Sequence, residues 1–425
     1  MWDLLVRGGR LLDPTSGRDD IADLAVHRGV VVATGESLDP ASAAQTVDAA
    51  GLLVTPGLVD IHTHVSPGTG YWGLDPETVA WRTGVTTWVD AGSVGAFGLG
   101  GLVASVRSAE VAITSLVNVS SIGIPGETGE HHDLTNLDVD LAHRVAAAHG
   151  DLVSGVKARI DRRTVGEHGI EPLRRGLELA DRLERPLMVH VGYGPPHIAD
   201  ILPLLRAGDI LTHCASGSPN DLLTRGQVSR PVLDAVERGV HLDLGHGSGA
   251  LDFEILEAEL AAGIRPTIST DLHAVSAHGP AFDLPTVMTK MLAVGWTLEE
   301  AVRSATIEPA RVLGLPAGSL EVGARADIAI FECVDEDHQV VDVHGQERTS
   351  PTRLRNVLTL AAGRPLTEKA PARSDPWVPR SDAQRAAEDE VFDELRQSTR
   401  PRLQGAADFP EPYPKASHHG DPDEE

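Results

Sequence analysis

Short apolar runs alternate with segments of helical periodicity from about residue 58 to residue 310. Parallel strands need crossover connections of a dozen or more residues, so this alternation is typical of a parallel sheet covered by helices. The runs that fit strands are 58–62, 86–90, 113–118, 155–159, 187–191, 210–214, 240–244 and 267–271. About eight strands over roughly 250 residues is what a (β/α)₈ barrel requires. We therefore predict an α/β fold of the TIM-barrel type, with a doubly wound sheet as the alternative.

Both ends of the chain are also rich in strand-like segments, which are separated by glycine-containing turns. These segments are 3–13 and 21–33 near the start, and 326–332 and 340–343 after the α/β region. A chain of 425 residues exceeds the size at which one hydrophobic core keeps growing. We therefore predict a small β-sandwich domain, built from both chain ends, beside the barrel.

The expected domain boundaries follow from these segments. Residues 1–56 and 312–366 form the small β domain, residues 57–311 the barrel, and residues 367–425 a C-terminal extension. Within the extension, residues 381–397 begin with a capping residue and have the composition of a helix. The acidic, proline-rich end of the extension is expected to be flexible and to lack a fold of its own.

The composition restricts the partners and the compartment. The chain carries 36 Lys and Arg against 62 Asp and Glu, a formal net charge of -26 at pH 7. Such a surface repels nucleic acid and anionic membranes, and no segment reaches the roughly 18 uninterrupted apolar residues of a membrane span. Cys214 and Cys333 are too few for a disulfide framework, and the first residues do not resemble a secretory signal. We expect a cytoplasmic protein that binds neither nucleic acid nor membrane.

The strongest chemical signal is the sequence Val-Asp-Ile-His-Thr-His at residues 59–64. Alternate side chains of a strand point to the same face, so His62 and His64 project together from the end of the first barrel strand. Active sites of (β/α)₈ barrels lie at this end. Two imidazoles at this spacing can bind one divalent ion, and a His-x-His pair without a metal is the alternative.

Polar side chains at the ends of later strands decide between these alternatives. Lys157 closes the fourth strand, His190 the fifth, His213 the sixth and Asp271 the eighth. Each is a metal-binding or metal-bridging group on an otherwise apolar run, and all meet at one end of the barrel. An ordinary buried polar residue explains each of them alone but does not explain the whole set. The sequence therefore predicts a metal site.

In these residues the chain resembles the amidohydrolase superfamily, in its binuclear form with a carboxylated lysine. The resemblance extends over about residues 3–363, and its motifs are 48–51, 54–64, the strand-end ligands and 318–327. The subgroup that it resembles most is that of the dihydroorotase-like deacetylases, through 155–159, 190–194, 212–216, 244–249 and 269–273. Glu308 departs from the pattern, since many relatives have Asn there, with little consequence for the chemistry.

The resemblance implies a role for each ligand. His62, His64 and Asp271 would bind the first metal. His190 and His213 would bind the second, and Lys157 would lie between the two. Lys157 would bridge the ions as a carbamate formed with CO₂. Two divalent ions about 3.5–4 Å apart repel each other and need an anionic bridge, which an ammonium group cannot provide. Zinc suits these ligands best, with manganese or cobalt as substitutes.

The implied reaction is hydrolysis by a hydroxide that bridges the two metals. The metals lower the pKa of the bound water, and Asp271 takes its proton and passes it to the leaving group. For this subgroup, the bond cleaved is an acetyl or other acyl amide or ester on a small α-substituted carboxylic acid. Barrels of this family often associate, so a homo-oligomer is expected.

Two other functions remain open at this point. Dihydroorotases usually carry Arg two residues after the second His of the pair, to hold the substrate carboxylate, and this chain has Ser66 there. A cyclic amide hydrolase of the dihydroorotase or hydantoinase type is therefore the second candidate. A non-catalytic scaffold that has lost its metals is the third, and the complete ligand set argues against it.

Four residues near the ligands are candidate substrate contacts. Arg159 points to the same face as Lys157, and its guanidinium can hold a substrate carboxylate through two bonds; a surface ion pair is the alternative. Tyr193 can donate to the oxyanion or pack against its loop. His246 lies in a glycine-rich loop after the seventh strand, and His273 follows the eighth. For both histidines a structural role is the alternative.

Overall fold

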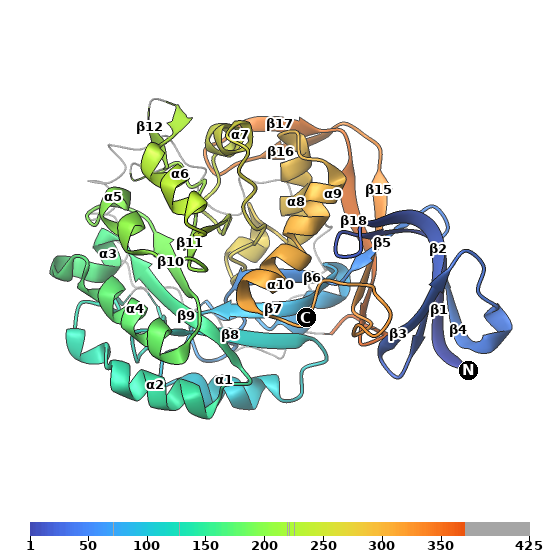
Figure 1. Cartoon of the computed structure of the whole chain (residues 1–425), viewed down its shortest axis with the longest axis horizontal. Helices are drawn as coiled ribbons and strands as arrows, with labels where there is room; N and C mark the ends of the chain where they lie inside the picture. The colour runs from blue at the N-terminus through green and yellow to red at the C-terminus, as the bar shows by residue number, and fades with distance from the viewer. Residues whose placement is uncertain (71, 127, 219, 221, 225, 370–425) are drawn as a thin grey trace, which may run out of the picture.

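A computed structural model describes residues 1–70, 72–126, 128–218, 220, 222–224 and 226–369. It consists of a barrel of strands and helices and a β domain at one side (Figure 1). The helix predicted at 381–397, and the rest of the extension beyond residue 369, lie outside the described residues. Within the described part, no helix is long and apolar enough to cross a membrane.

Seven parallel strands form most of the barrel wall, in the order β14-β11-β10-β9-β8-β7-β6. Their bounds are β6 (Leu58–Thr63), β7 (Val85–Ala91), β8 (Ala112–Asn118), β9 (Val153–Ile160), β10 (Leu187–Val191), β11 (Ile210–Thr212) and β14 (His241–Asp243). All seven coincide with runs that the sequence indicated as strands. The predicted (β/α)₈ architecture is thereby confirmed for seven of its strands.

The eighth run, 267–271, closes the ring without forming a regular strand. Thr267 makes an isolated parallel bridge to Asp243 at the end of β14, and Leu272 makes another to Thr63 of β6. Asp271, between the two bridges, has a backbone φ of +46°, which no extended strand allows. The ring therefore closes through single bridges around a residue that the sequence identified as a ligand.

In the described part of the chain, ten α-helices accompany the strands, and Figure 1 shows them around the barrel. They are α1 (Leu99–Val106), α2 (Val139–Ala148), α3 (Arg162–Val165), α4 (Glu171–Leu183), α5 (Ile198–Ile201), α6 (Arg230–Glu237), α7 (Phe253–Ala261), α8 (Leu284–Ala293), α9 (Leu298–Ser304) and α10 (Ile307–Leu313). A short hairpin joins β12 (Leu223–Thr224) to β13 (Gln227–Val228).

The helix α4 shows how the sequence fixes one such element. Pro172 lies in the first turn, where its missing N–H costs nothing, and the helix stops at Glu184 in a left-handed conformation. Its buried residues include Leu173, Gly176 and Leu179, which share one face at helical spacing. A Cβ at Gly176 would lie in ordinary van der Waals contact, 3.4 Å from the side chain of Ala158 on β9, so this face of the helix packs directly on the sheet.

Both chain ends join in one eight-stranded sheet, in the order β19-β18-β15-β5-β1-β2-β3 with β4 paired to β1. The strands are β1 (Trp2–Asp13), β2 (Arg18–His27), β3 (Val30–Gly35), β4 (Ala43–Asp48), β5 (Leu53–Pro56), β15 (Ile328–Val334), β18 (Arg353–Ala361) and β19 (Arg364–Pro365). The antiparallel pair of β5 and β15 joins the two ends, and Val6, Leu24 and Ile328 share one buried core. The predicted β domain is therefore confirmed.

One segment predicted for the β domain lies elsewhere. The run 340–343 falls in a separate hairpin of β16 (His338–Val341) and β17 (Glu347–Ser350), which packs on the barrel helix α8 (Figure 1). Arg348 binds Glu257 of α7 through two bonds of 2.6 and 3.0 Å, and Asp342 accepts a 3.0 Å bond from the backbone of Phe253. The hairpin is therefore part of the outer layer of the barrel, because these contacts hold it there.

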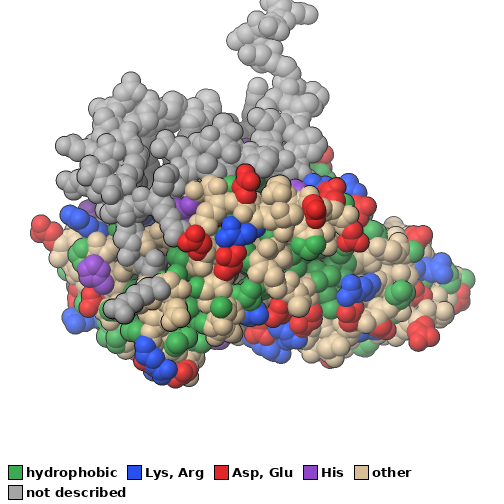
Figure 2. Space-filling model, turned by 90° about the horizontal axis from the view of Figure 1, so that it is seen from above, with side chains coloured by type: hydrophobic (Ala, Val, Ile, Leu, Met, Phe, Trp, Pro, Cys, Tyr) green, Lys and Arg blue, Asp and Glu red, His purple; other side chains and the backbone are tan. Residues whose placement is uncertain are grey.

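Positive and negative side chains are mixed on the surface shown in Figure 2. Figure 2 shows Asp and Glu side chains mixed with Lys and Arg over the described surface of that face, rather than one sign gathered in a field. The charges of this face therefore do not select one class of substrate, and the pocket residues are the groups that can.

Candidate metal centre

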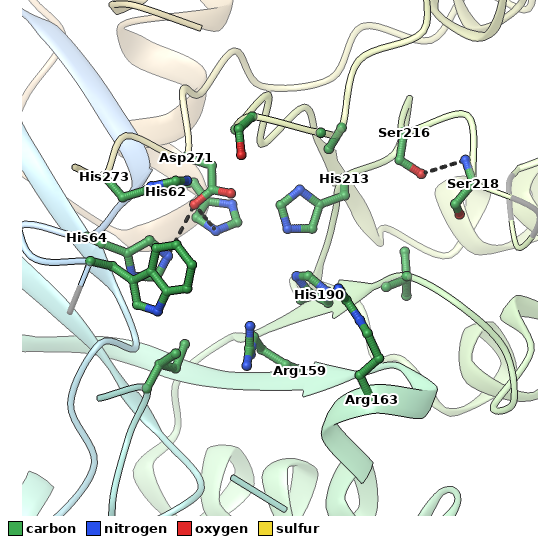
Figure 3. A pocket seen from close by; sticks show the side chains of 18 of the residues that line it. His62, His64, Arg159, Arg163, His190, His213, Ser216, Ser218, Asp271 and His273 are labelled. Carbon is green, nitrogen blue, oxygen red and sulfur yellow. Dashed lines mark hydrogen bonds and ion pairs between the residues drawn. The ribbon is translucent and has the colours of Figure 1, made fainter. Parts of the chain in front are cut away.

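All six predicted ligands line one pocket at the C-terminal ends of the barrel strands, with a cavity volume of about 230 Å³. They are His62, His64, Lys157, His190, His213 and Asp271. In Figure 3 the four histidines and Asp271 turn toward the same space. The fold thus brings into one pocket the six residues that the sequence placed at the ends of barrel strands.

His62, His64 and Asp271 form a group that can hold a metal ion. Their ligand atoms lie within 4.8 Å of one another. Oδ1 of Asp271 is 3.1 Å from Nε2 of His64 and 3.5 Å from Nε2 of His62. Among the described residues this buried oxygen has no hydrogen-bond partner. A buried carboxylate oxygen without a partner is costly, and a cation between the three groups would satisfy it.

The rings of His62 and His64 are held by their other nitrogens. Nδ1 of His62 lies 2.8 Å from Oγ1 of Thr212, which itself donates a 2.6 Å bond to Asp243. Nδ1 of His64 lies 2.8 Å from Oγ of Ser93. Because each Nδ1 faces a hydroxyl, each Nε2 faces the pocket and can present a lone pair to a metal.

His190 and His213 are oriented in a similar way from the neighbouring strands. Nε2 of His190 lies 3.0 Å from Oδ2 of Asp161, so its Nδ1 is the nitrogen left for the pocket. Nδ1 of His213 lies 2.7 Å from the carbonyl of Gly245, which leaves Nε2. The rings of His190 and His213 are 4.4 Å apart, and His213 is 5.0 Å from His62. The second pair therefore lies directly beside the first group.

Burial keeps these rings in the form that binds metals. It holds the pKa values of His62 and His213 well below the usual value and lowers that of His190. Burial acts to raise the pKa of Asp271, but His62 and His64 outweigh it and hold that pKa well below its usual range. Neutral imidazoles and an ionised carboxylate are the ligand forms that a divalent cation requires.

Lys157 lies among these ligands in the interior of the barrel. Its side chain is 1 % exposed, and Nζ lies 3.0 Å from Nε2 of His62 and 3.3 Å from the sulfur of Met188. Burial lowers the pKa of this amine to about 8, which favours the neutral form. A Cβ at Gly92 would lie 2.5 Å from the Lys157 side chain, so glycine clears its path. A neutral, enclosed amine is the form that reacts with CO₂.

Two ligands have a strained backbone. His213 and Asp271 have φ angles of +65° and +46°, a left-handed conformation that non-glycine residues seldom adopt. Such strain is concentrated at functional sites, where the surrounding structure holds it. Here it turns both side chains out of the strand direction and into the pocket.

Three of the four predicted substrate contacts line the pocket: Arg159, Tyr193 and His273. Arg159 is bound by Glu130 through two bonds of 2.7 and 2.8 Å, a buried ion pair rather than the surface pair considered from the sequence. His273 packs edge-on against Trp72, with ring centres 5.3 Å apart. Glu130 was not identified from the sequence, because it lies in a loop with no strand or helix pattern around it.

His246 does not line the pocket, contrary to the place predicted for it. It is fully buried, with Nδ1 at 2.9 Å from the carbonyl of Gly247 and Nε2 at 2.8 Å from Nζ of Lys290 on α8. The glycine-rich loop turns its backbone toward the pocket and this ring away from it. The structure therefore places the His246 ring against Lys290 and outside the pocket.

Several pocket residues were not identified from the sequence: Trp72, Ile124, Arg163, Ser216 and Ser218. The orienting groups Thr212, Asp243 and Asp161 were also missed. All three lie at or just after the C-terminal end of a barrel strand, as the ligands do, so strand-end position was an available signal. For the loop residues no comparable signal exists.

Known proteins share this fold over most of the chain. The model of the amidohydrolase family matches residues 53–352. A deacetylase of Enterococcus faecalis is 31% identical over 369 residues, which cover 85% of this chain and 98% of that protein. A solved structure described as an adenine deaminase matches with a TM-score of 0.80 and 31% identity, over 86% of this chain and 99% of the other. One described as a dihydroorotase matches with a TM-score of 0.79 and 30% identity, over 86% and 98%.

These relatives carry three different names on one fold, so the names do not specify a single substrate. The family match nevertheless extends over the whole barrel and includes every ligand described above. Members of this family are hydrolases that act on C–N bonds and typically bind metals. The chain belongs to the amidohydrolase family.

Proposed function

We propose that this protein is a binuclear, metal-dependent deacylase, which removes an acetyl or other small acyl group from an α-substituted carboxylic acid. Zinc is the proposed metal, because nitrogen ligands dominate the site and Asp271 supplies the oxygen. Lys157, carboxylated by CO₂, is the proposed bridge between the two ions.

The observation that carries the proposal is the orientation of the four histidines. Each has one ring nitrogen held by Thr212, Ser93, Asp161 or the Gly245 carbonyl. Each therefore offers its other nitrogen to the pocket. His62, His64 and Asp271 could hold one ion, and His190 and His213 could hold a second.

The side chains of the chain have separate tasks in the proposed reaction. When bound, the metal ions supply Lewis acidity and a water of lowered pKa. Asp271 accepts a proton from the attacking water, whose oxygen forms a bond to the acyl carbon. The bond from that carbon to the leaving nitrogen or oxygen then breaks, and Asp271 returns the proton to the leaving atom. His62 and His64 hold the Asp271 carboxylate in place.

The charge of the site supports an anionic substrate. Two divalent ions, the carbamate, Asp271 and a hydroxide leave about one positive charge by simple counting. Arg159 and Arg163 also line the pocket, each beside a buried carboxylate, Glu130 for Arg159 and Asp161 for Arg163. The deacetylase name of the Enterococcus faecalis relative supports removal of an acetyl group.

A cyclic amide hydrolase is the second candidate, because a solved structure described as a dihydroorotase matches this chain at 30% identity. The residue two positions after His64 argues against this candidate. It is Ser66, an uncharged side chain that is fully buried, contacts Thr69 and does not line the pocket. A substrate carboxylate held at this position would lack its arginine.

A panel of substrates tests the proposal. Protein loaded with zinc and bicarbonate is assayed with O-acetyl 2-hydroxy acids and N-acetyl 2-amino acids of both configurations, and with dihydroorotate and hydantoins. We expect turnover of at least one acetylated acid and none of the cyclic amides. Turnover of the cyclic amides alone would replace the proposal with the second candidate.

A further inference from the structure

We propose that Arg163, together with the hydroxyl of Ser218, binds the substrate carboxylate, in place of Arg159. The inference rests on the proposed function, since it assigns the groups that recognise the acid in that reaction. Arg163 and Ser218 both line the pocket that contains the ligands.

Arg159 already has a dedicated counter-ion. Glu130 is fully buried, and both of its oxygens bind the Arg159 guanidinium, which is 13 % exposed. Although burial acts to raise it, the pKa of Glu130 is lowered, because Arg159 lies against it. The charge of Arg159 is therefore already neutralised by Glu130. A substrate carboxylate at Arg159 would gain little attraction and would be repelled by the Glu130 carboxylate.

The side chain of Arg163 is more exposed than that of Arg159, and its counter-ion, Asp161, also binds other groups. The Arg163 side chain is 27 % exposed, and Nη2 lies 3.2 Å from Oδ2 of Asp161. The same oxygen accepts from His190, and the other oxygen of Asp161 accepts the backbone N–H groups of Arg163 and Thr164. The single carboxylate of Asp161 is thus shared among four donors, whereas both oxygens of Glu130 bind one guanidinium.

The loop after β10 holds the guanidinium in position. The Arg163 guanidinium lies over the ring of Tyr193, with its carbon 5.5 Å from the ring centre. The backbone N–H of Arg162 donates a 2.8 Å bond to the Tyr193 carbonyl, which ties this loop to α3. Stacking on an aromatic ring restricts the rotation of an arginine without using its hydrogen bonds. Tyr193 therefore acts as a platform for Arg163.

Ser218 supplies an independent sign of a ligand on the same side of the pocket. It is 4 % exposed, and its Oγ has no hydrogen-bond partner among the described residues. Ser216 accepts a 3.3 Å bond from the Ser218 backbone N–H, which holds this turn. In Figure 3, Arg163, Ser216 and Ser218 lie beyond His190 and His213 as seen from Asp271 and His64. A carboxylate there would satisfy the Ser218 hydroxyl.

This arrangement separates the two ends of the substrate. The acyl group would lie between the metal ligands and Asp271, and the carboxylate would lie at Arg163 and Ser218. Hydrogen bonds from a guanidinium and a hydroxyl select a carboxylate over a neutral group of the same shape, because an uncharged group leaves the arginine without its charge partner.

The test compares each acid with its primary amide, which has nearly the same shape and no charge. The probes are O-acetyl-lactate and N-acetyl-alanine, both configurations, with O-acetyl-lactamide and N-acetyl-alaninamide as their neutral partners. Lactate and lactamide are also titrated calorimetrically into the metal-loaded protein, which measures recognition without turnover. We expect the wild-type protein to prefer each acid on the order of 100-fold, in kcat/KM and in binding.

The variants are Arg163→Met, Ser218→Ala, Arg159→Met and the matched control Arg162→Met, which alters the adjacent, exposed arginine of α3. In Arg163→Met the preference should fall to within about threefold, and in Ser218→Ala it should fall by about tenfold. Arg163→Lys should keep part of it, because the charge remains without the fork. Arg162→Met and Arg159→Met should keep the wild-type preference, and metal content checks that each site is intact.

Each result bears on the inference. An unchanged preference in metal-replete Arg163→Met, or its loss in Arg159→Met, would overturn it. Equal binding of lactate and lactamide by the wild-type protein would also overturn it, while turnover of acetylated compounds would leave the proposed function standing. Absence of all deacylation would remove the proposed function, and calorimetry would still decide which arginine recognises the acid.

Discussion

Lys157 is the residue whose surroundings are least compatible with an ordinary lysine. It lies buried beside a histidine nitrogen and a thioether, and burial lowers its pKa to about 8. We predict that Lys157→Ala loses bound metal and lowers kcat/KM by at least about 1,000-fold, because the anionic bridge is gone. Metal analysis of the purified protein and steady-state kinetics measure the two effects.

Chemical rescue of the Lys157→Ala variant by added carboxylic acids distinguishes a carbamate bridge from a packing role of the lysine side chain. Acetate, propionate or another short carboxylic acid should restore part of the metal content and activity of Lys157→Ala by occupying the space of the carbamate. Lys369→Ala is the control, since Lys369 makes exposed ion pairs with Glu77 and Glu110. Full activity of Lys157→Ala without any added acid would refute the bridge.

Thr212, on β11, orients His62 of β6 from across the barrel. Its hydroxyl faces Nδ1 of His62 and donates to Asp243. Thr212→Val keeps the shape and removes the hydroxyl, so we expect metal affinity to fall about 10- to 100-fold with little change in fold. Competition with a metal chelator measures this affinity. Thr114→Val removes a strand hydroxyl that donates only to a backbone carbonyl, and should bind metal as the wild type does.

The grouping of the six candidate ligands at one end of the barrel could be predicted from the sequence, whereas the contacts that orient them could not. Alternate strand residues share a face, so His62 and His64 follow directly from their spacing. The contact between His62 and Thr212 depends on which strands meet across the barrel, and no local pattern encodes it. The same holds for Arg159 and Glu130, whose pairing decides which arginine remains for a substrate.

At the scale of elements, the loop after β14 forms one wall of the pocket through its backbone. Gly247 has a φ of +51°, and a Cβ there would lie 2.7 Å from Oδ2 of Asp271. Gly247→Ala should therefore displace the Asp271 carboxylate and lower kcat about 10- to 100-fold, since small displacements of catalytic groups are costly.

A second glycine variant distinguishes displacement of the Asp271 carboxylate from the effect of backbone strain. Gly263 also has a positive φ, of +77°, but a Cβ there would meet nothing within 4 Å. Gly263→Ala should lose a comparable amount of stability and keep its kcat. If both variants lose kcat equally, strain and not the contact with Asp271 is the cause.

Lys290 connects α8 to this loop and makes stability depend on pH. Its Nζ donates to the Pro280 carbonyl and contacts His246, and burial lowers its pKa to about 7 from 10.5. Between these two values the unfolded chain binds the proton and the folded chain does not, so stability rises with pH. The rise attributable to Lys290 is up to roughly 5 kcal/mol, and lies between pH 7 and 10.5.

Denaturant titrations of the wild-type protein and of Lys290→Met at pH 7 and pH 9.5 measure this effect. We expect the difference in unfolding free energy between the two proteins to shift in favour of the wild type as the pH rises. Curves that stay parallel over this range would show that Lys290 has the same proton occupancy in both states.

Among the elements, regular strands were predictable and irregular ones were not. Seven barrel strands coincide with apolar runs, because a strand covered on both faces must be apolar throughout. The eighth run makes only isolated bridges to its neighbours, and it ends at Asp271 in a left-handed conformation. The run 340–343 has the composition of a strand, but its place on the barrel depends on Arg348 and Asp342, which meet α7 only after folding.

At the scale of the whole molecule, the chain places its chemistry at one end of a barrel and leaves the β domain outside the pocket. Every residue that lines the pocket falls between 62 and 273, within the predicted barrel segment. The ends of the chain form their own core through β5 and β15. This separation explains why the family and the ligands could be inferred from the sequence, while the substrate depends on loops that the fold does not dictate.

A metal titration of activity tests the central claim most directly. Metal-free protein is titrated with zinc, with and without bicarbonate, and deacylation of the best acetylated acid is measured at each ratio of zinc to protein. We predict activity that rises to a plateau at two ions per chain and that depends on bicarbonate. Full activity without metal, or a plateau at one ion that ignores bicarbonate, would contradict a binuclear site bridged by carboxylated Lys157.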